Sequence, residues 1–357
     1  MKSYKIAVIE GDGIGHEVVP EGLRVLEAAA RRYDISFSWH RFDWSCQTFL
    51  KTGRMMPEDG LDQLRGLDAI YLGAVGYPGV PDHVSLWGLL IPIRRAFQQY
   101  VNLRPVRLLQ GVDSPIKGFP PGQIDLCVVR ENNEGEYSEA GGRIYRDTEF
   151  EVAIQEAVFT RRGCDRIMRY AFHLSQTRKC HLTSATKSNG IIHSMPFWDE
   201  RFSFVARDFP DVRTDQYHID ILAAHLVQHP EWFDVIVASN LFGDILSDLA
   251  AAVVGSIGLA PAANINPERQ YPSMFEPVHG SAPDIAGKGV ANPVAQIWSG
   301  AMMLQHLGEP MAARTVEKAL ETVLARSDVH TPDLGGKANT RDMGDAIAHE
   351  VSAVAES

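Results

Sequence analysis

Apolar and polar positions follow two different patterns along the chain. Residues 5–10 and 124–130 are short apolar runs of strand length. Residues 17–33 instead place apolar side chains such as Val18 and Leu26 at helical spacing. Because runs of the first kind alternate with stretches of the second kind throughout, the pattern predicts an α/β protein.

The same two patterns predict the other elements of the fold. Residues 135–148 have the character of an exposed hairpin or arm, with Gly141 and Gly142 at its turn. The remaining predicted strands are residues 35–42, 68–75, 101–109, 150–159, 179–184 and 234–239, and the remaining predicted helices are residues 86–98, 293–307, 312–326 and 342–355.

The length of 357 residues is comfortable for two domains. No internal repeat and no low-complexity linker divides the sequence into consecutive halves. We therefore expect two domains that are intertwined, and the Gly/Pro-rich residues 258–272 are one expected crossing point.

Composition narrows the class of protein. Apolar residues make up 45% of the sequence and charged residues 22%, which excludes a disordered or fibrous protein. The net charge of −11 argues against general nucleic-acid binding. No apolar run approaches the roughly 20 residues of a membrane helix, and the first ten residues lack a signal-peptide pattern. The four cysteines are widely spaced, match no zinc pattern and favour a reducing compartment, so we expect a cytoplasmic protein.

A glycine-rich turn follows the first predicted strand. Gly11, Gly13 and Gly15 open the first helix, but His16 stands where a Rossmann fingerprint needs its third glycine. The spacing therefore excludes a Rossmann site. It leaves open a tight strand-to-helix turn or a cofactor-contacting turn of another kind.

Two aspartates stand on one face of a predicted helix that is otherwise apolar. Asp244 and Asp248 are four residues apart, and like charges at that spacing are unfavourable unless a cation neutralises them. Carboxylate oxygens suit Mg²⁺ or Mn²⁺. The alternative is that Asp244 only supports the helix N-terminus, and Asp220 taken alone is most simply an N-cap.

Three arginines border apolar segments. Arg94 belongs to a predicted helix, and Arg104 and Arg130 lie in or beside predicted strands. A buried guanidinium group needs an anionic partner, which is either a structural ion pair or a substrate carboxylate. Lys187 and Tyr137 are each either a solvated loop residue or an acid–base group.

Taken in order, these residues resemble the family of metal-dependent β-decarboxylating 2-hydroxyacid dehydrogenases, and the resemblance covers essentially the whole chain. Residues 85–90 and 185–190 are similar to the tartrate and D-malate branch. The markers are GDGIG at 11–15, NLRP at 102–105, RENNEGEY at 130–137, TKSN at 186–189, NLFGDILSD at 240–248 and EPVHGSAPDIAGKGVANP at 276–293.

The resemblance implies an isopropylmalate dehydrogenase-like fold, with two intertwined α/β domains around a mixed sheet. Residues 1–100 plus 258–357 would form the cofactor-binding domain. Residues 101–257 would bind substrate and metal and form a homodimer, with an interlocking arm at 136–159. The usual proline after GDGIG is His16 here.

The resemblance also assigns roles to the candidate site residues. Mn²⁺ or Mg²⁺ would be the metal, and whether a monovalent cation such as K⁺ assists is open. Lys187 and Asp220 would enter the active site of the partner subunit, so the two sites would be shared. The implied roles are metal binding for Asp220, Asp244 and Asp248, carboxylate binding for Arg94, Arg104 and Arg130, general base for Lys187 and general acid for Tyr137.

The cofactor implied by the resemblance is NAD. A carboxylate at Asp284 would bind the ribose hydroxyls and repel a 2′-phosphate, whereas NADP-using relatives carry Lys and Tyr where this chain has Asp284 and Ile285. The residues expected to contact the cofactor are Glu276, His279, Gly280, Ser281, Ala282, Asp284, Asn292 and Asn189.

The substrate implied is a small C4 2-hydroxy diacid, tartrate or D-malate. In the family, residues before Arg94 face the C3 substituent, and here they are Trp87, Leu90 and Ile91. These large side chains leave little room beyond a hydrogen or hydroxyl. If Trp87 instead packs in the core, the specificity is undetermined. The alternative functions are a 3-isopropylmalate or isocitrate dehydrogenase and, in a different class, a non-catalytic regulatory subunit.

Overall fold

The computed structural model describes residues 2–353 and divides into two compact units. The first unit contains the chain up to residue 99, residues 107–124 and the chain from residue 251 onward. The second contains residues 100–106 and 125–250. The chain returns to the first unit for the last time at residue 251, inside a helix. Residues 107–124 belong to the first unit, although residues 101–257 are expected to form one domain.

The first unit is built on a mixed sheet. Its strand order is β2-β1-β3-β12-β11, in which β1 pairs in parallel with β2 and β3, β12 pairs in parallel with β3, and β11 is antiparallel to β12. The strands are β1 (Lys2–Gly11), β2 (Ile35–Arg41), β3 (Ala69–Ala74), β11 (Pro261–Ile265) and β12 (Ser273–Pro277).

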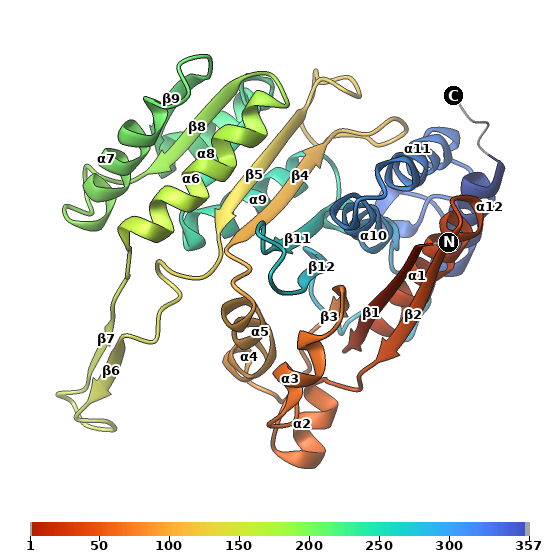
Figure 1. The fold of residues 1–357 in the computed structure, drawn as a ribbon, viewed down its shortest axis with the longest axis horizontal. Helices are drawn as coiled ribbons and strands as arrows, with labels where there is room; N and C mark the ends of the chain where they lie inside the picture. Colours follow the sequence, from red (N-terminus) through yellow and green to blue (C-terminus); the bar gives the residue numbers. More distant parts are fainter. Residues whose placement is uncertain (1, 354–357) are drawn as a thin grey trace. The chain divides into compact units, whose positions relative to one another are not determined.

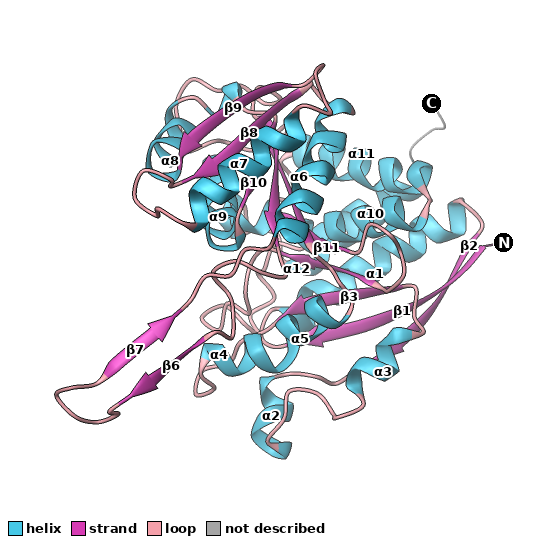
Figure 2. Ribbon diagram, turned by 60° about the vertical axis from the view of Figure 1, so that its left-hand side comes forward, coloured by secondary structure: helices cyan, strands magenta, loops and turns pink. Residues whose placement is uncertain are grey.

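Helices cover this sheet because each carries an apolar stripe that water would otherwise contact. Helix α1 buries Val18, Val25 and Leu26, and it packs on α10 and α12 (Figure 2). The helical segments are α1 (Gly15–Arg32), α2 (Cys46–Thr52), α3 (Gly60–Arg65), α4 (Asp82–Ser85), a π-helical turn (Leu86–Leu90), α5 (Ile91–Ala96), α10 (Val294–Leu307), α11 (Pro310–Arg326), α12 (Thr340–Ala353) and the 3₁₀ turns Ile257–Leu259 and Pro332–Leu334.

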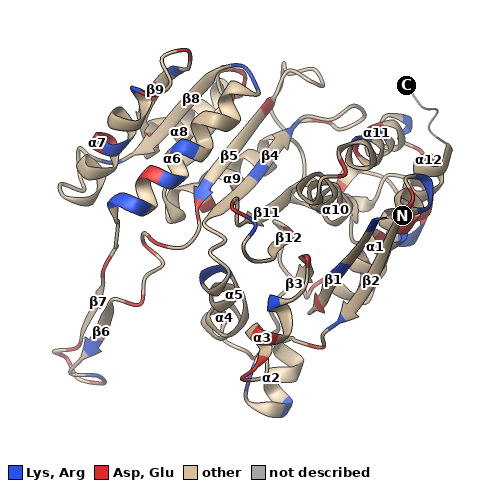
Figure 3. Cartoon of the chain, viewed as in Figure 1, with Lys and Arg blue, Asp and Glu red and all other residues tan. Residues whose placement is uncertain are grey.

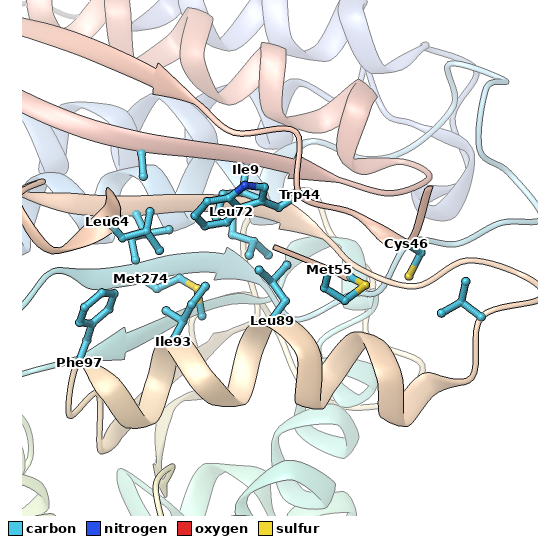
Figure 4. Close-up of a cluster of buried hydrophobic side chains, with 13 residues drawn as sticks. Ile9, Trp44, Cys46, Met55, Leu64, Leu72, Leu89, Ile93, Phe97 and Met274 are labelled. Atoms are coloured by element: carbon cyan, nitrogen blue, oxygen red, sulfur yellow. The ribbon is translucent and has the colours of Figure 1, made fainter. Parts of the chain in front are cut away.

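A buried apolar cluster fixes the segment that precedes Arg94. Leu89, Ile93 and Phe97 follow one another at helical spacing and point into the cluster, where they meet Leu72 and Met274 of the sheet (Figure 4). Burying a side chain such as Leu89 stabilises the fold by about 2 kcal/mol. The opposite face of the same segment is therefore directed away from this core.

The second unit is built on a sheet with the order β4-β5-β10-β8-β9. Strand β10 pairs in parallel with β5 and β8, and β8 pairs in parallel with β9. The elements are β4 (Val101–Arg107), β5 (Asp125–Glu131), α6 (Arg161–Gln176), β8 (His181–Thr186), α7 (Ser194–Ala206), β9 (Arg213–His218), α8 (Ile219–Gln228), a 3₁₀ turn (Pro230–Trp232), β10 (Val235–Ala238) and α9 (Asn240–Val253).

Strands β5, β8 and β10 are buried almost throughout, as expected for central parallel strands with helices on their faces. Helix α6 carries four arginines and one acidic residue, Asp165 (Figure 3). Both units alternate strands and helices, so the predicted α/β class with a mixed sheet is confirmed. Within residues 2–353, no helix is both long and apolar enough to cross a membrane.

An arm leaves the second unit between β5 and α6. It consists of the antiparallel strands β6 (Gly141–Ile144) and β7 (Val152–Gln155), which are exposed along their whole length (Figure 1). The arm is predicted correctly, but the position of its turn is wrong. The turn lies at residues 145–151, and Gly141 instead pairs with Gln155, where a Cβ atom would collide with the backbone of Ile154 on the facing strand.

Other element predictions differ in detail. Residues 150–159 contain a strand of only four residues, Val152–Gln155. Residues 258–272, expected as a domain crossing, form β11 and its flanking turns. The helix expected at residues 86–98 begins with a π-helical turn. Helix α12 is found where residues 342–355 predict it, and residues 354 and 355 lie outside the described residues.

Candidate active site

Parallel pairing brings the end of β5 to the start of α9. Ala238 of β10 pairs beside Arg130 of β5, and α9 begins at Asn240. Because the carboxyl ends of parallel strands meet at one edge of a sheet, Arg130 lies against the first turn of α9. Gly243 makes this approach possible, since a Cβ atom there would lie only 2.6 Å from the Cβ atom of Arg130.

Arg130 is the centre of a polar cluster. Its side chain is almost completely buried, and its Nε and Nη2 atoms donate hydrogen bonds of 2.9 and 2.6 Å to Oδ1 of Asn240. Nη1 forms an ion pair with Asp244. The ring of Tyr137 lies against the guanidinium group, with 5.5 Å between Cζ and the ring centroid. The hydroxyl group of Tyr137 donates a 2.9 Å hydrogen bond to Oδ2 of Asp244.

Arg104 joins the same cluster from β4. Its Nη1 atom lies 3.3 Å from a carboxylate oxygen of Asp244 and 3.3 Å from one of Asp248. Nη1 also donates to Oγ of Ser247 at 2.6 Å, and Nε donates to Oδ1 of Asn102 at 2.7 Å. The two aspartates that the sequence places four residues apart therefore share one buried guanidinium group.

The charges of this cluster balance within the second unit. Burial raises the pKa of Asp248, with a further contribution from the carboxylate of Asp244, while Arg104 opposes the effect. Burial and the neighbouring Asp244 carboxylate raise the pKa of Tyr137. The phenol therefore keeps its proton at neutral pH, and the two carboxylates favour a nearby cation.

Lys187 and Asp220 form a second polar pair in this unit. Lys187 follows β8, Asp220 lies in the first turn of α8, and the parallel strands β8 and β9 bring them together. Nζ of Lys187 donates a 2.8 Å hydrogen bond to Oδ1 of Asp220. This hydrogen bond lowers the pKa of Asp220. Asn189, a predicted cofactor contact, is exposed in the loop after Lys187.

The single chain does not gather the three predicted metal ligands. Among residues 2–353, no group of three or more His, Cys, Asp or Glu side chains is placed to hold a metal ion. Asp244 and Asp248 lie together, whereas Asp220 is bound to Lys187 and is mostly exposed. Asp244 and Asp248 on α9 therefore supply only two of the three expected carboxylates within one chain.

In the first unit, the predicted substrate ligand Arg94 pairs with a predicted cofactor contact. Nη2 of Arg94 lies 2.7 Å from Oε1 of Glu276, and both side chains are buried. Nδ2 of Asn264 donates a second hydrogen bond of 2.7 Å to the same oxygen. Nε of Arg94 is buried and has no hydrogen-bond partner among the described residues. Glu276 therefore satisfies only part of the donors of this guanidinium group.

The predicted specificity residues lie on the segment that Leu89 and Ile93 anchor. Trp87 and Leu90 are half-buried, and Ile91 is buried. Leu90 packs against the core cluster of Figure 4, whereas Trp87 and Ile91 are not part of it. The guanidinium group of Arg95 lies over the indole of Trp87, with 4.9 Å between Cζ and the ring centroid. The π-helical turn at Leu86–Leu90 displaces these side chains from regular helical positions.

The predicted cofactor loop packs against the glycine-rich turn. The backbone N–H of Ile14 donates a 2.9 Å hydrogen bond to the carbonyl of Ser281. Ile14 and Val18 form a small apolar cluster with Ala282, Ile285 and Ala291. The glycine-rich turn thus supports the loop, which agrees with the possibility of a cofactor-contacting turn. Asp284 is exposed on this loop, and Gly280 has open space around it.

Two polar side chains flank the loop. His279 is buried, its Nδ1 atom lies 3.0 Å from the carbonyl of Gly280, and its Nε2 atom has no partner among the described residues. Burial lowers the pKa of His279, so the imidazole is neutral. Asn292 donates to a carboxylate oxygen of Asp333 at 3.0 Å and accepts from the backbone of Val294.

Three polar residues of these clusters are not identified from the sequence. Asn240 binds Arg130 through two hydrogen bonds, Glu136 binds the start of α9, and Asp333 binds Asn292. Asn240 and Glu136 both lie within the quoted sequence markers, so their polar character at strand and helix ends is the signal that could have found them. Asp333 carries no such signal, because only the fold brings it to Asn292.

Comparison with known proteins identifies the relatives of this chain. Residues 5–347 match the family described as isocitrate/isopropylmalate dehydrogenase. The chain is 58% identical to the D-malate dehydrogenase (decarboxylating) of Escherichia coli strain K12, over 97% of this chain and 98% of that enzyme. It is 56% identical to the tartrate dehydrogenase/decarboxylase of Pseudomonas putida, over 97% of each chain.

Solved structures show the same fold. The isocitrate dehydrogenase from Methylococcus capsulatus superposes with a TM-score of 0.89 and is 36% identical, over 98% of this chain and 99% of that one. The TT0538 protein from Thermus thermophilus superposes with a TM-score of 0.85 and 35% identity, over 97% of this chain and 68% of that one.

Proposed function

The chain belongs to the isocitrate/isopropylmalate dehydrogenase family, and we propose that it oxidises and decarboxylates a small C4 2-hydroxy diacid, D-malate or tartrate. Family membership makes it an oxidoreductase that depends on a nicotinamide dinucleotide and a divalent cation. The observation that carries the proposal is the polar cluster of the second unit, in which buried Arg104 and Arg130 meet Asp244, Asp248 and Tyr137. Buried guanidinium groups form bidentate hydrogen bonds with carboxylates, so two of them beside possible metal-binding aspartates suit a substrate with two carboxylates.

The residues present fit a divalent metal. Asp244 and Asp248 offer hard oxygen donors on one face of α9. Partial burial and the neighbouring Asp244 carboxylate raise the pKa of Asp248, which a bound cation would lower. We propose that these two aspartates hold Mn²⁺ or Mg²⁺ together with Asp220 from a second copy of the chain. A bound metal would withdraw electrons from the C2 oxygen of the substrate and so favour its oxidation and the loss of CO₂. K⁺ as an additional activator belongs to the same proposal.

The residues also fit NAD. The unpartnered Nε2 atom of buried His279, the open space around Gly280 and the exposed carboxylate of Asp284 lie on one supported loop. In the proposal, His279 to Ala282 with Glu276 and Asn292 bind the dinucleotide, Asp284 binds the adenosine ribose, and Asn189 supplies a further contact. NAD supplies the acceptor for the hydride that leaves C2 of the substrate.

The acid–base groups divide the proton transfers between them. Lys187 accepts the proton of the C2 hydroxyl group, directly or through a water molecule. Arg94, Arg104 and Arg130 bind the carboxylates and orient the bond to the departing CO₂. Tyr137, which keeps its proton at neutral pH, donates a proton to C3. Groups of this kind contribute about 10²–10⁴-fold each.

A homodimer with shared sites completes the proposal. Several apolar side chains of the arm are exposed, which supports its packing on a second copy of the chain. The exposed arm residues are Ile144, Tyr145, Phe150, Val152 and Ile154. Lys187 and Asp220 form a pair that would serve the site of the second copy.

The cysteines support the proposed location. All four cysteines are free, which supports a reducing compartment such as the cytoplasm.

The proposed function is tested with purified protein, Mn²⁺ and NAD. D-malate, the tartrate isomers, 3-isopropylmalate and isocitrate are compared by NADH formation and CO₂ release. We expect the highest kcat/KM with a C4 diacid and loss of turnover when the metal is chelated. A tenfold preference for isocitrate or 3-isopropylmalate contradicts the substrate, and no turnover with any of them contradicts the function.

A further inference from the structure

The carboxylate of Glu136 binds the start of helix α9 from a distant part of the chain. Its Oε1 atom accepts a 2.7 Å hydrogen bond from Oγ of Ser239, and its Oε2 atom accepts a 3.0 Å hydrogen bond from the backbone N–H of Leu241. The first N–H groups of a helix have no partner within the helix, and a negative charge is favourable beside them. Glu136 therefore acts as a cap on α9 that comes from another segment.

The next residue along the chain binds the same helix one turn later. Tyr137 donates its hydroxyl hydrogen to Asp244, which lies four residues after Asn240, the first residue of α9. A third tie comes from Nδ2 of Asn240, which donates to the carbonyl of Glu134 at 3.2 Å. Residues 134–137 are thus held along the first turn of α9 by three separate contacts.

The same segment is the base of the exposed arm. Gly135 pairs with Val158 at the other side of the arm, and beyond this bridge the strands β6 and β7 are exposed. The position of the Tyr137 phenol on α9 therefore depends on what fixes the backbone beside it. Glu136 contributes two hydrogen bonds at that point.

We propose that Glu136 is a positioning residue, which fixes the phenol of Tyr137 relative to α9 and its aspartates. The inference rests on the proposed function, in which Tyr137 donates a proton to the substrate carbon. Glu136 itself has both carboxylate oxygens engaged by Ser239 and Leu241, so it acts through Tyr137. A displacement of about 1 Å at a reacting group can cost on the order of a hundredfold in rate.

The first experiment compares Glu136→Ala, Glu136→Gln and Tyr137→Phe in the Mn²⁺- and NAD-dependent turnover of D-malate. Glu136→Ala should lower kcat by about ten- to a hundredfold with little change in KM for NAD. Glu136→Gln keeps one acceptor oxygen and should restore part of the rate. In the Tyr137→Phe background, Glu136→Ala should cost less than about threefold more, because its effect runs through the missing phenol.

A matched control separates positioning from simple loss of a cap. Ser45 caps helix α2 of the first unit by accepting a 3.1 Å hydrogen bond from the backbone N–H of Thr48. Ser45→Ala should lower Tm without lowering kcat. The proposal is overturned when Glu136→Ala behaves in the same way, or when its effect adds in full to that of Tyr137→Phe.

A measurement that needs no turnover keeps this inference separate from the proposed function. With ¹³Cζ-labelled tyrosine, the resonance missing in Tyr137→Phe identifies Tyr137 at one fixed pH. Glu136→Ala should move that resonance, whereas Ser45→Ala should leave it in place. If the resonance does not move in Glu136→Ala, the inference is overturned even when the enzyme is active. If the resonance moves in Glu136→Ala but the wild-type protein turns over no diacid, only the proposed function is contradicted.

Discussion

Nζ of Lys187 lies 2.8 Å from Oδ1 of Asp220, so a proposed base and a proposed metal ligand form one ion pair on neighbouring strand ends of the second unit. Neither residue is needed to fill the core, since the Lys187 side chain is partly exposed and that of Asp220 is mostly exposed. The pair is therefore free to serve a site. Its chemical roles can be separated by changing one member at a time.

Lys187→Ala should remove most turnover, by about 10²–10⁴-fold, because the hydroxyl proton loses its acceptor. NAD and Mn²⁺ should still bind. The measurement is kcat with D-malate beside NAD and Mn²⁺ titrations of the same preparation. Lys179→Ala, which changes an exposed lysine before β8, is the matched control and should retain wild-type kcat. Near-normal turnover of Lys187→Ala would exclude this lysine as the base.

Asp248→Asn should weaken Mn²⁺ binding by about tenfold or more, because a charged oxygen ligand is lost and Arg104 is left without one of its counter-charges. The apparent affinity is read from kcat as a function of free Mn²⁺. Asp208→Asn is the matched control, since Asp208 has a similar exposure in the same unit and pairs with Arg169. Equal Mn²⁺ affinities in the two variants would remove Asp248 from the metal site.

Much of the second-unit cluster is predictable from the sequence, because it depends on strand ends and helix spacing. Asp244 and Asp248 meet one guanidinium group since residues four apart lie on the same face of a helix. Buried strands of a parallel sheet read as apolar runs, so β5 and β10 are found as well.

Other contacts depend on tertiary pairing that no local pattern encodes. Arg94 and Glu276 are 182 positions apart, and both are predicted as ligand contacts although they bind one another in the structure. Strand β9, which precedes Asp220, is missed because its residues are polar and none of them is buried. The contact of Arg95 with Trp87 spans a π-helical turn, whereas the sequence predicts a regular helix there.

NAD should be preferred over NADP in kcat/KM, because the exposed carboxylate of Asp284 would repel a 2′-phosphate. Replacing Asp284 with Lys and Ile285 with Tyr should raise kcat/KM for NADP and lower it for NAD. Asp62→Lys, with the same change of charge at an exposed position on α3, should leave the ratio of the two values unchanged. A wild-type preference for NADP would contradict the assignment of Asp284.

Stability should depend on pH through Glu131. Burial raises the pKa of this carboxyl group from 4.5 to about 7. Because the folded state holds the proton more tightly, the stabilising contribution is complete below about pH 4.5 and is lost as the pH rises through 7. The full loss corresponds to about 3 kcal/mol. Glu131→Gln cannot ionise, so its stability should fall less between pH 5 and pH 8.

Urea denaturation at several pH values measures this difference. The free energy of unfolding of Glu131→Gln minus that of the wild type should grow with pH over the stated range. Glu200→Gln removes an exposed carboxyl group of the same unit and should give a nearly constant difference. Parallel pH profiles for the wild type and Glu131→Gln would show that Glu131 is ionised in the folded protein already at low pH.

Trp87 should restrict the substrate at C3. It lies outside the core that Leu89 and Ile93 fill, and its indole is held by the guanidinium group of Arg95. Trp87→Ser removes the indole and opens space beside C3 of the substrate. The ratio of kcat/KM for 3-isopropylmalate to that for D-malate should therefore rise by about tenfold, which is the effect of about one methylene group in an apolar pocket. Leu26→Ala is the matched control, because it truncates a buried core side chain of α1 in the same unit and should lower Tm without changing the ratio. An unchanged ratio in Trp87→Ser would mean that the indole serves packing with Arg95 and that specificity against the isopropyl group arises elsewhere, for example from Leu90 or Ile91.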